Sequence, residues 1–309
     1  MNQNNNTDTY DGEIDLRDLF RIIWSKKVLI GSITSIAAIF SVLYALNLPN
    51  MYSSSSLLAP TSQNDSMSSK LGGLSGLAGL AGVSLPSGNI SNSQIAVKRI
   101  ESFEFFSTYF LPNIELKNLI AVKSWSAKDN ALTYDKSLYD VSNDEWVRKV
   151  SYPKKVKPSD QEAFKDYKKL LSMTQDELTG LVYISIEHQS PVIAKKWLDI
   201  IIYNINESMR ELDKKDAQNS INFLNETSST VKIQSIKDVV SKLLEAQMQT
   251  LMLASSNESY VFKTINAPII PEDKSSPNRA IICILGSVLG LILSLLLVLI
   301  QHHRRDSKI

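Results

Sequence analysis

Residues 280–300 read "AIICILGSVLGLILSLLLVLI", a run of 21 residues without a charged side chain. A second run, residues 28–48, reads "VLIGSITSIAAIFSVLYALNL" and carries no charge either. About 20 helical residues cross the hydrocarbon core of a bilayer. Because backbone groups in lipid need partners within their own segment, we predict that both runs are transmembrane helices.

The flanks of the two runs argue against other interpretations. A cleaved signal peptide is the alternative for 28–48, but its apolar region is usually only about 7–15 residues long. The preceding 27 residues also carry five acidic side chains, unlike a short basic leader. A buried helix of a soluble core is the alternative for 280–300, but only a short basic tail follows it to cover such a helix.

Flanking charge predicts the orientation of the two spans. Basic residues precede the first span and follow the second: Arg21, Lys26, Lys27, Arg304, Arg305 and Lys308. Cytoplasmic flanks are enriched in Lys and Arg, so we expect the tails 1–27 and 301–309 to be cytoplasmic. Residues 49–279 would then lie on the far side, in a periplasm or an extracellular space.

Bulk composition excludes some classes of protein. The net charge of +1 over 309 residues argues against a nucleic-acid-binding protein, which usually has a strong basic excess. The one cysteine, Cys283, lies inside the second run. The chain therefore has neither an internal disulfide nor a thiolate metal cluster.

The region 49–279 contains both predicted helices and predicted strands. Capping residues and 3.6-residue apolar periods predict helices over 92–110, ending at Pro112, and over 159–171, beginning with Ser159 and Glu162 in capping-box spacing. Runs rich in β-branched and aromatic residues predict strands at 51–60, 181–187 and 260–268. The glycine- and leucine-rich stretch 71–89 reads as an apolar loop or as a contact element, and 113–158 gives no clear pattern.

A long helical arm is predicted from Ser190 and Pro191 onward, over about 191–254. The apolar side chains fall every three or four residues and define a packing stripe: Ile193, Trp197, Ile201, Ile205, Met209 and Leu212. Further out, to about residue 228, the helix is mostly polar, so we expect it to project from the base. A break at 229–234 precedes a returning helix whose predicted face is Ile236, Val240, Leu243, Leu244, Met248 and Leu251.

Two further features concern the membrane. Pro268, Pro271 and Pro277 precede the second span, and proline blocks both helix and sheet, so we predict a rigid extended connector. Gly286 and Gly290 form a G-x-x-x-G motif, whose small residues let helix backbones approach closely. It is either ordinary glycine in a span or a contact with the first span or with another copy.

No catalytic, cofactor or metal motif is present in the sequence. Phosphate-binding loops, nucleophile elbows and histidine pairs with zinc spacing are all missing. His188 stands alone at a strand end and reads as a solvated or capping side chain. The acidic stretches "SNDEW" (142–146) and "TQDEL" (174–178) read as solvated surface rather than as paired catalytic carboxylates.

Three segments together resemble the polysaccharide co-polymerases, the Wzz-type chain length determinant proteins. The first is "GEIDLRDLFRIIWSKKVLI" (12–30), which leads into span one. The second is "SPVIAKKWLDIIIYNINESMRELDKKDAQNSINFL" (190–224), which is similar to the family's long helix. The third is "SPNRAIICILGSVLGLILSLLLVLI" (276–300), the proline-rich entry into span two.

This resemblance implies an α+β membrane protein of the bacterial inner membrane. Two transmembrane helices would flank a periplasmic domain with an α/β base near the membrane and long projecting helices. Members form ring-like homo-oligomers and set the modal length of a lipid-linked polysaccharide, such as O-antigen, without catalysis. The implied partners are further copies of the chain, a separate polymerase and the growing lipid-linked polysaccharide; no cofactor is implied.

Other functions stay open on the sequence. Some relatives carry a cytoplasmic tyrosine kinase domain, for which the nine residues after span two leave no room. One alternative is a capsule or exopolysaccharide export protein that links inner-membrane machinery to an outer-membrane channel. Another is a two-span sensor, which would need a signalling module after span two.

Overall fold

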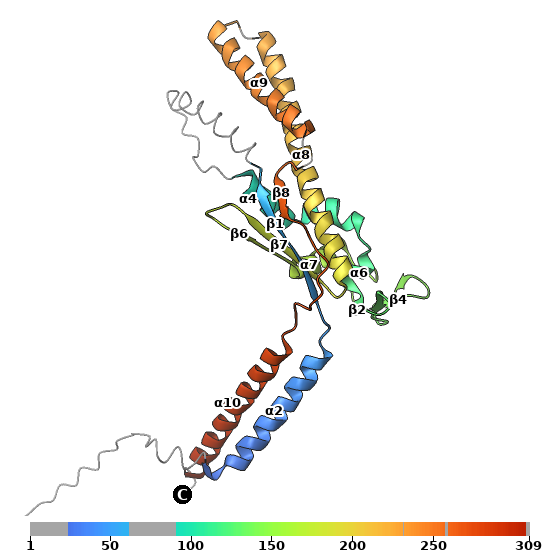
Figure 1. Cartoon of the computed structure of the whole chain (residues 1–309), viewed down its shortest axis with the longest axis vertical. Helices are drawn as coiled ribbons and strands as arrows, with labels where there is room; N and C mark the ends of the chain where they lie inside the picture. Colours follow the sequence, from blue (N-terminus) through green and yellow to red (C-terminus); the bar gives the residue numbers. More distant parts are fainter. Residues whose placement is uncertain (1–23, 62–90, 231, 257–258, 307–309) are drawn as a thin grey trace, which may run out of the picture. The chain divides into compact units, whose positions relative to one another are not determined.

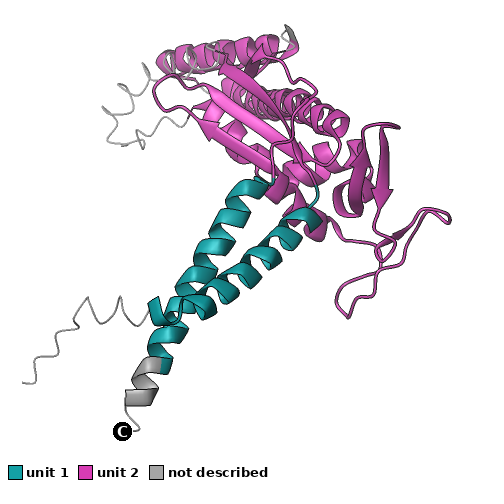
Figure 2. Cartoon of the chain, turned by 60° about the horizontal axis from the view of Figure 1, so that its bottom comes forward, with its two compact units in different colours: residues 1–49, 277–309 teal, residues 50–276 magenta. Residues whose placement is uncertain are grey.

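The computed structural model describes residues 24–61, 91–230, 232–256 and 259–306. The chain divides into two compact units, residues 1–49 with 277–309 and residues 50–276 (Figure 2). The division falls close to the boundaries that the apolar runs predict. The glycine-leucine stretch 71–89 lies outside the described residues.

The first unit consists of two apolar helices that lie side by side, α2 (Lys27–Asn47) and α10 (Arg279–Asp306) (Figure 1). Both are long and apolar enough to cross a membrane. The first begins and ends one residue before the predicted span 28–48. The second begins two residues after Pro277 and continues beyond residue 300 as helix. The two membrane spans that the composition predicts thus have counterparts in the structure.

The second unit is built on a four-stranded antiparallel sheet in the order β6–β7–β1–β8. The strands are β1 (Tyr52–Pro60), β6 (Leu171–Gln175), β7 (Val182–His188) and β8 (Phe262–Asn266). Tyr52 pairs with His188 and Leu58 with Val182, so the end of β1 that follows α2 lies beside the end of β7 that leads into the long helix. The predicted α+β membrane class is confirmed.

Aromatic rings fill the core between the sheet and its helices. Tyr167 of α7 (Asp160–Leu170) lies 4.8 Å from Phe110 and 5.1 Å from Phe106, measured between ring centroids. Phe110 in turn meets Trp197 edge-on at 5.7 Å. All four side chains are at most 2% exposed, and contacts of this kind favour offset or edge-on packing. This cluster ties α7 and the long helix to one core.

The predicted helix 92–110 is wrong as a single element. Ser91 starts α4 (Asn92–Ile100) with a capping box, as its sequence indicates. Ser102 then caps a new start, so that α5 (Phe103–Phe105) runs into a π-helical turn, Phe106–Phe110. Pro112 lies inside a following 3₁₀ turn, Leu111–Asn113, where its missing N–H is not needed, and so does not end the segment.

The stretch 113–158 forms an insert with two small sheets. It contains α6 (Leu116–Ile120), the hairpin β2 (Val122–Ser126) and β3 (Ala131–Tyr134), and the pair β4 (Tyr139–Asp140) and β5 (Glu145–Trp146). Trp125 packs edge-on against Tyr52 at 5.4 Å. Its strands are too short and too interrupted for the sequence to show a clear period.

The helical arm consists of α8 (Pro191–Thr230, 40 residues) and α9 (Gln234–Ser256, 23 residues). At 1.5 Å per residue α8 is about 60 Å long. Its first half packs against β1 and β7, whereas its outer half runs on beside α9 (Figure 1). Where the sequence predicts a helix over 192–228 and a break at 229–234, the structure has a helix to Thr230 and the next from Gln234.

Candidate functional site

The inner half of α8 carries the predicted packing stripe. Ile201 and Ile205 are 0% exposed, and Trp197 and Met209 are 2% exposed. Ile193 and Leu212, at the two ends of the stripe, are only partly buried. The buried face is wider than the six predicted positions, because Leu198, Ile202 and Ser208 on the neighbouring positions are buried as well. The role of the stripe in assembly stays a prediction.

Asn206 is a structural residue that the apolar pattern does not reveal. Its Oδ1 accepts hydrogen bonds from the backbone N–H groups of Val261 at 2.8 Å and Phe262 at 2.9 Å. Its Nδ2 donates to the carbonyl of Ile202 at 3.1 Å. The buried amide of Asn206 on α8 therefore fixes the start of β8. In the sequence, the one indication of this role is that Asn206 is a polar residue among the apolar positions of the stripe.

Asp213 makes a second contact between α8 and the approach to β8. Tyr260 donates its hydroxyl to the carboxylate at 2.6 Å. Burial raises the pKa of Asp213 above its usual range, while the bond from Tyr260 opposes that rise. Thr61 donates its hydroxyl to the Tyr260 carbonyl at 2.6 Å. The chain is thus held on both sides where it returns from the arm to the sheet.

The outer part of the arm exposes apolar side chains. On α8 Phe223 is 66% exposed, and on α9 Met248 is 50% and Met252 71% exposed. The last two lie one helical turn apart and so share a face. The predicted returning helix is present and lies beside α8, and Ile236 at its start is also 43% exposed, so part of its apolar side is not covered by the described residues.

The segment between β8 and α10 follows β1 through serine side chains. Ser54 and Ser56 are nearly fully buried, and they donate to the carbonyls of Ile269 at 2.9 Å and Asn266 at 2.6 Å. Met51 donates its N–H to the carbonyl of Ser276 at 2.9 Å. The side chains of Ser54 and Ser56 thus bind a segment that makes few backbone hydrogen bonds with β1.

The three predicted connector prolines lie along this segment. Pro268 is buried, Pro271 and Pro277 are partly buried, and helix begins only at Arg279. Pro268 and Pro271 belong to the second unit and Pro277 to the first. Because the connector crosses the boundary between the units, its stiffness stays a prediction.

Gly286 and Gly290 face α2 within the first unit. A Cβ atom on Gly286 would come within 2.3 Å of the Ser41 hydroxyl oxygen, and one on Gly290 within 2.4 Å of the Ala37 methyl. Ser41 also donates to the carbonyl of Ile282 at 2.8 Å. Small residues at this spacing allow the two backbones to approach closely.

His188 is a capping residue and is buried. Its Nδ1 accepts a hydrogen bond from the N–H of Ser190, 2.9 Å away, at the start of α8. The other nitrogen, Nε2, lies 2.9 Å from the carbonyl of Asn118 and therefore carries the proton. Burial lowers the pKa of His188 and favours this neutral form. The solvated alternative is wrong, since the residue is 2% exposed.

The acidic stretches build turns. In "TQDEL" the Asp176 carboxylate accepts the backbone N–H groups of Leu178 at 2.8 Å and Thr179 at 3.3 Å, which lowers the pKa of Asp176. In "SNDEW" Asp144 accepts from the Tyr139 hydroxyl and from Lys117. Within the described ranges, no group of three or more His, Cys, Asp or Glu residues could hold a metal ion.

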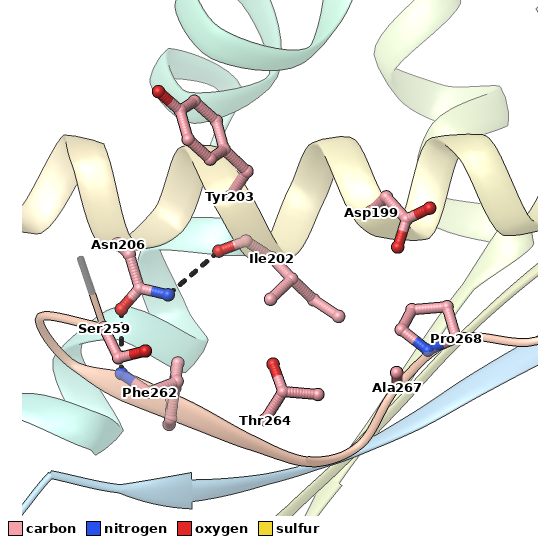
Figure 3. Close-up of a pocket in the computed structure, with 9 residues that line it drawn as sticks. All are labelled: Asp199, Ile202, Tyr203, Asn206, Ser259, Phe262, Thr264, Ala267 and Pro268. Atoms are coloured by element: carbon pink, nitrogen blue, oxygen red, sulfur yellow. Dashed lines mark hydrogen bonds between the residues drawn. The ribbon is translucent and has the colours of Figure 1, made fainter.

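A groove of about 330 Å³ lies between α8 and β8 (Figure 3). Two of its polar side chains already have structural roles. Asn206 holds the start of β8, and Asp199 pairs with Lys195 at 2.7 Å. Tyr203, on the rim, is 70% exposed. The groove therefore offers shape and an aromatic edge.

The chain matches one family model and is similar to several solved structures, among them two polysaccharide co-polymerases. The family model for the chain length determinant protein, Wzz, matches residues 12–102. The chain is similar to a full-length bacterial polysaccharide co-polymerase at 13% identity and a TM-score of 0.39, over 94% of this chain and 99% of that one.

It is also similar to a fragment of WzzB, a polysaccharide co-polymerase from Salmonella Typhimurium, at 16% identity and a TM-score of 0.29, over 74% of this chain and 100% of that one. No curated protein matches the sequence. The matched residues 12–102 include α2, β1 and α4. Residues 12–102 therefore match the family model of the Wzz chain length determinant proteins, and the predicted resemblance to the polysaccharide co-polymerases is confirmed.

Proposed function

We propose that this protein regulates the modal chain length of a lipid-linked surface polysaccharide, the O-antigen of lipopolysaccharide, as an oligomeric co-polymerase. It acts beside a separate polymerase in the bacterial inner membrane, with both termini cytoplasmic and residues 49–279 in the periplasm. The observation that carries the proposal is the match of residues 12–102 to the family model of the chain length determinant proteins. Two membrane-length helices, one before and one after the base and arm in the sequence, support it.

In this proposal the assembly, rather than a pocket in one subunit, sets the length of the polymer. The arm supplies surface for self-association, since Phe223, Met248 and Met252 are at least half exposed. Large exposed apolar patches usually mark interaction sites. Further copies of the chain would cover these side chains, and the rigid inner half of α8 would hold each arm at a fixed angle to its own base.

Three titratable side chains, His188, Asp176 and Glu162, already have structural hydrogen bonds, which supports a role without catalysis. His188 caps α8, Asp176 closes a turn and Glu162 holds a loop through Arg148. Each of these groups is already bound to backbone or to a charge partner. A catalytic acid or base instead needs a lone pair or proton aimed at a site where a substrate can lie.

The test is deletion of the gene followed by gel electrophoresis of lipopolysaccharide. We expect the clustered band pattern to give way to a broad distribution of short chains, and plasmid-borne wild-type protein to restore the cluster. Unchanged banding would overturn the proposal. Loss of surface capsule with unchanged banding would favour the export role instead.

A further inference from the structure

One surface of the second unit combines dense positive charge with exposed apolar side chains. Residues 147–157, "VRKVSYPKKVK", here called the basic loop, contain five cationic residues and no acid. Tyr152 is 97% exposed, Val156 50% and Val147 43%. A hollow of about 830 Å³ lies between this loop and the start of α7. Three of the loop's lysines and Lys165 line it, as do the carboxylates of Asp160 and Glu162.

The basic loop has a built shape. Arg148, the second residue of the loop, donates to the carbonyls of Lys155 at 2.6 Å and Val156 at 2.7 Å. The same guanidinium binds both carboxylate oxygens of Glu162, at 3.1 and 2.6 Å. These bonds hold the pKa of Glu162 down to about 2. Because one arginine fixes two loop carbonyls, the lysines are presented on a defined backbone.

Most of the positive charge of the loop is unneutralised. Arg148 is paired with Glu162, and Lys154 lies 3.7 Å from the same carboxylate while remaining 62% exposed. Within the described part of the chain, the ammonium groups of Lys149, Lys155 and Lys157 have no carboxylate within 4 Å. A surface of this charge fits an anionic partner.

The insert that carries this loop contacts a residue that follows a predicted membrane span closely in the sequence. Trp125 of the insert packs on Tyr52, which follows the last residue of α2 by five positions. Five extended residues reach at most about 18 Å. A separate set of ring contacts in the insert joins Tyr134 to Tyr139 and Tyr139 to Trp146, which immediately precedes the loop.

We propose that the basic loop docks on the anionic headgroup surface of the membrane that α2 and α10 cross. Lysines at such a surface gain electrostatic free energy from anionic lipids. Tyrosine is enriched where a protein meets the membrane interface, because its ring is apolar and its hydroxyl polar. Tyr152 and Val156 enter the interface while the lysines bind phosphates. The contact is a second support for the base, in addition to the two spans.

The experiment uses the full chain with Cys283→Ser, so that one introduced cysteine can be labelled. Ser151→Cys, beside Tyr152, receives an environment-sensitive fluorophore, and the protein is placed in lipid nanodiscs, which are open to solvent on both faces. The matched control is Leu178→Cys. Leu178 is also 97% exposed, but it lies in the β6–β7 turn beside acidic residues, at the opposite end of β7 from His188.

In nanodiscs containing phosphatidylglycerol we expect the label at position 151 to be shielded from iodide and quenched by spin-labelled lipid. The label at position 178 should be quenched by iodide and should not be quenched by spin-labelled lipid. Changing Lys154, Lys155 and Lys157 to Gln should expose the label at 151, because each lysine shifts the equilibrium about fivefold and the three together on the order of 100-fold. The same charge removed from the arm, at Lys232, Lys237 and Lys242, should have no effect.

Equal iodide quenching at positions 151 and 178 would overturn the proposal. Shielding that persists in pure phosphatidylcholine or after the triple lysine change would also overturn it, and would indicate contact with another copy of the chain. The inference rests on the proposed two-pass topology but not on control of polymer length. If the label at position 151 is not shielded but deletion of the gene still changes the lipopolysaccharide banding, only the docking proposal fails. If deletion leaves the banding unchanged, the proposed function fails.

Discussion

Replacing Asn206 by alanine tests how the arm is joined to the sheet. The Asn206 side chain is 7% exposed and is the acceptor for the N–H groups of both Val261 and Phe262, which are 2% and 1% exposed. Alanine cannot accept a hydrogen bond, and water has little access to these two amides. The substitution therefore leaves two buried donors without an acceptor.

The expected cost follows from the number of orphaned groups. A buried donor that loses its partner costs about 1–3 kcal/mol, so two such donors cost about 2–6 kcal/mol. Every 1.4 kcal/mol is a factor of ten in an equilibrium. If the loss is confined to local opening of β8, amide exchange at positions 261 and 262 should accelerate by at least about thirtyfold.

Hydrogen–deuterium exchange of the full-length protein in detergent, read by mass spectrometry on peptides spanning 259–266, measures this directly. The matched control is Asn204→Ala on the same helix, whose side chain donates to the Tyr109 carbonyl at 2.9 Å and does not contact β8. Exchange at 261 and 262 should be unchanged in that control. Wild-type exchange rates in Asn206→Ala would refute the argument that this amide holds β8.

Three further predictions address the core, the membrane helices and acid sensitivity. Ile201→Asp places an unpaired charge at a position that is 0% exposed, at a cost of several kcal/mol, and should abolish the folded oligomer in size-exclusion chromatography. Gly290→Leu should lower Tm in detergent by separating α10 from α2, whereas Gly31→Leu, which has no atom within 4 Å of its Cβ position, should not. The pair of Glu162 with Arg148 stabilises the fold above pH 4.5, and this stability is lost as pH falls toward about 2, so Glu162→Gln should flatten urea stability over that range. A variant with wild-type acid sensitivity would contradict the last prediction.

Local signals in the sequence predicted much of the fold. The spans follow from charge-free length, and the capping box of Ser159 and Glu162 starts α7 where spacing indicates. The start of α8 at Pro191 is equally local, because proline suits a first helical turn. In each case the determining atoms lie within a few residues of one another.

Long-range pairing could not be predicted in the same way. The order β6–β7–β1–β8 joins strands more than 100 residues apart, and alternation along a strand says which face is buried but not which strand lies beside it. Ser54 and Ser56 show this limit, since four consecutive serines do not indicate which hydroxyls are buried. Their partners, the carbonyls of Ile269 and Asn266, lie more than 200 residues away.

The errors have physical causes as well. The segment 92–110 has a continuous apolar period, yet Ser102 caps a new start and interrupts it. On α9 the period continues through Ile236 and Met248, although these side chains are 43% and 50% exposed. Periodicity reports an apolar face and does not say whether this chain or a second copy covers it.

The most direct test of the central claim, that a multimer of this chain sets polymer length, is native mass spectrometry of the purified protein released from detergent. We predict one dominant assembly whose mass is a fixed integer multiple of 34.5 kDa. A spectrum that shows only the 34.5 kDa monomer at every detergent and protein concentration would contradict the account.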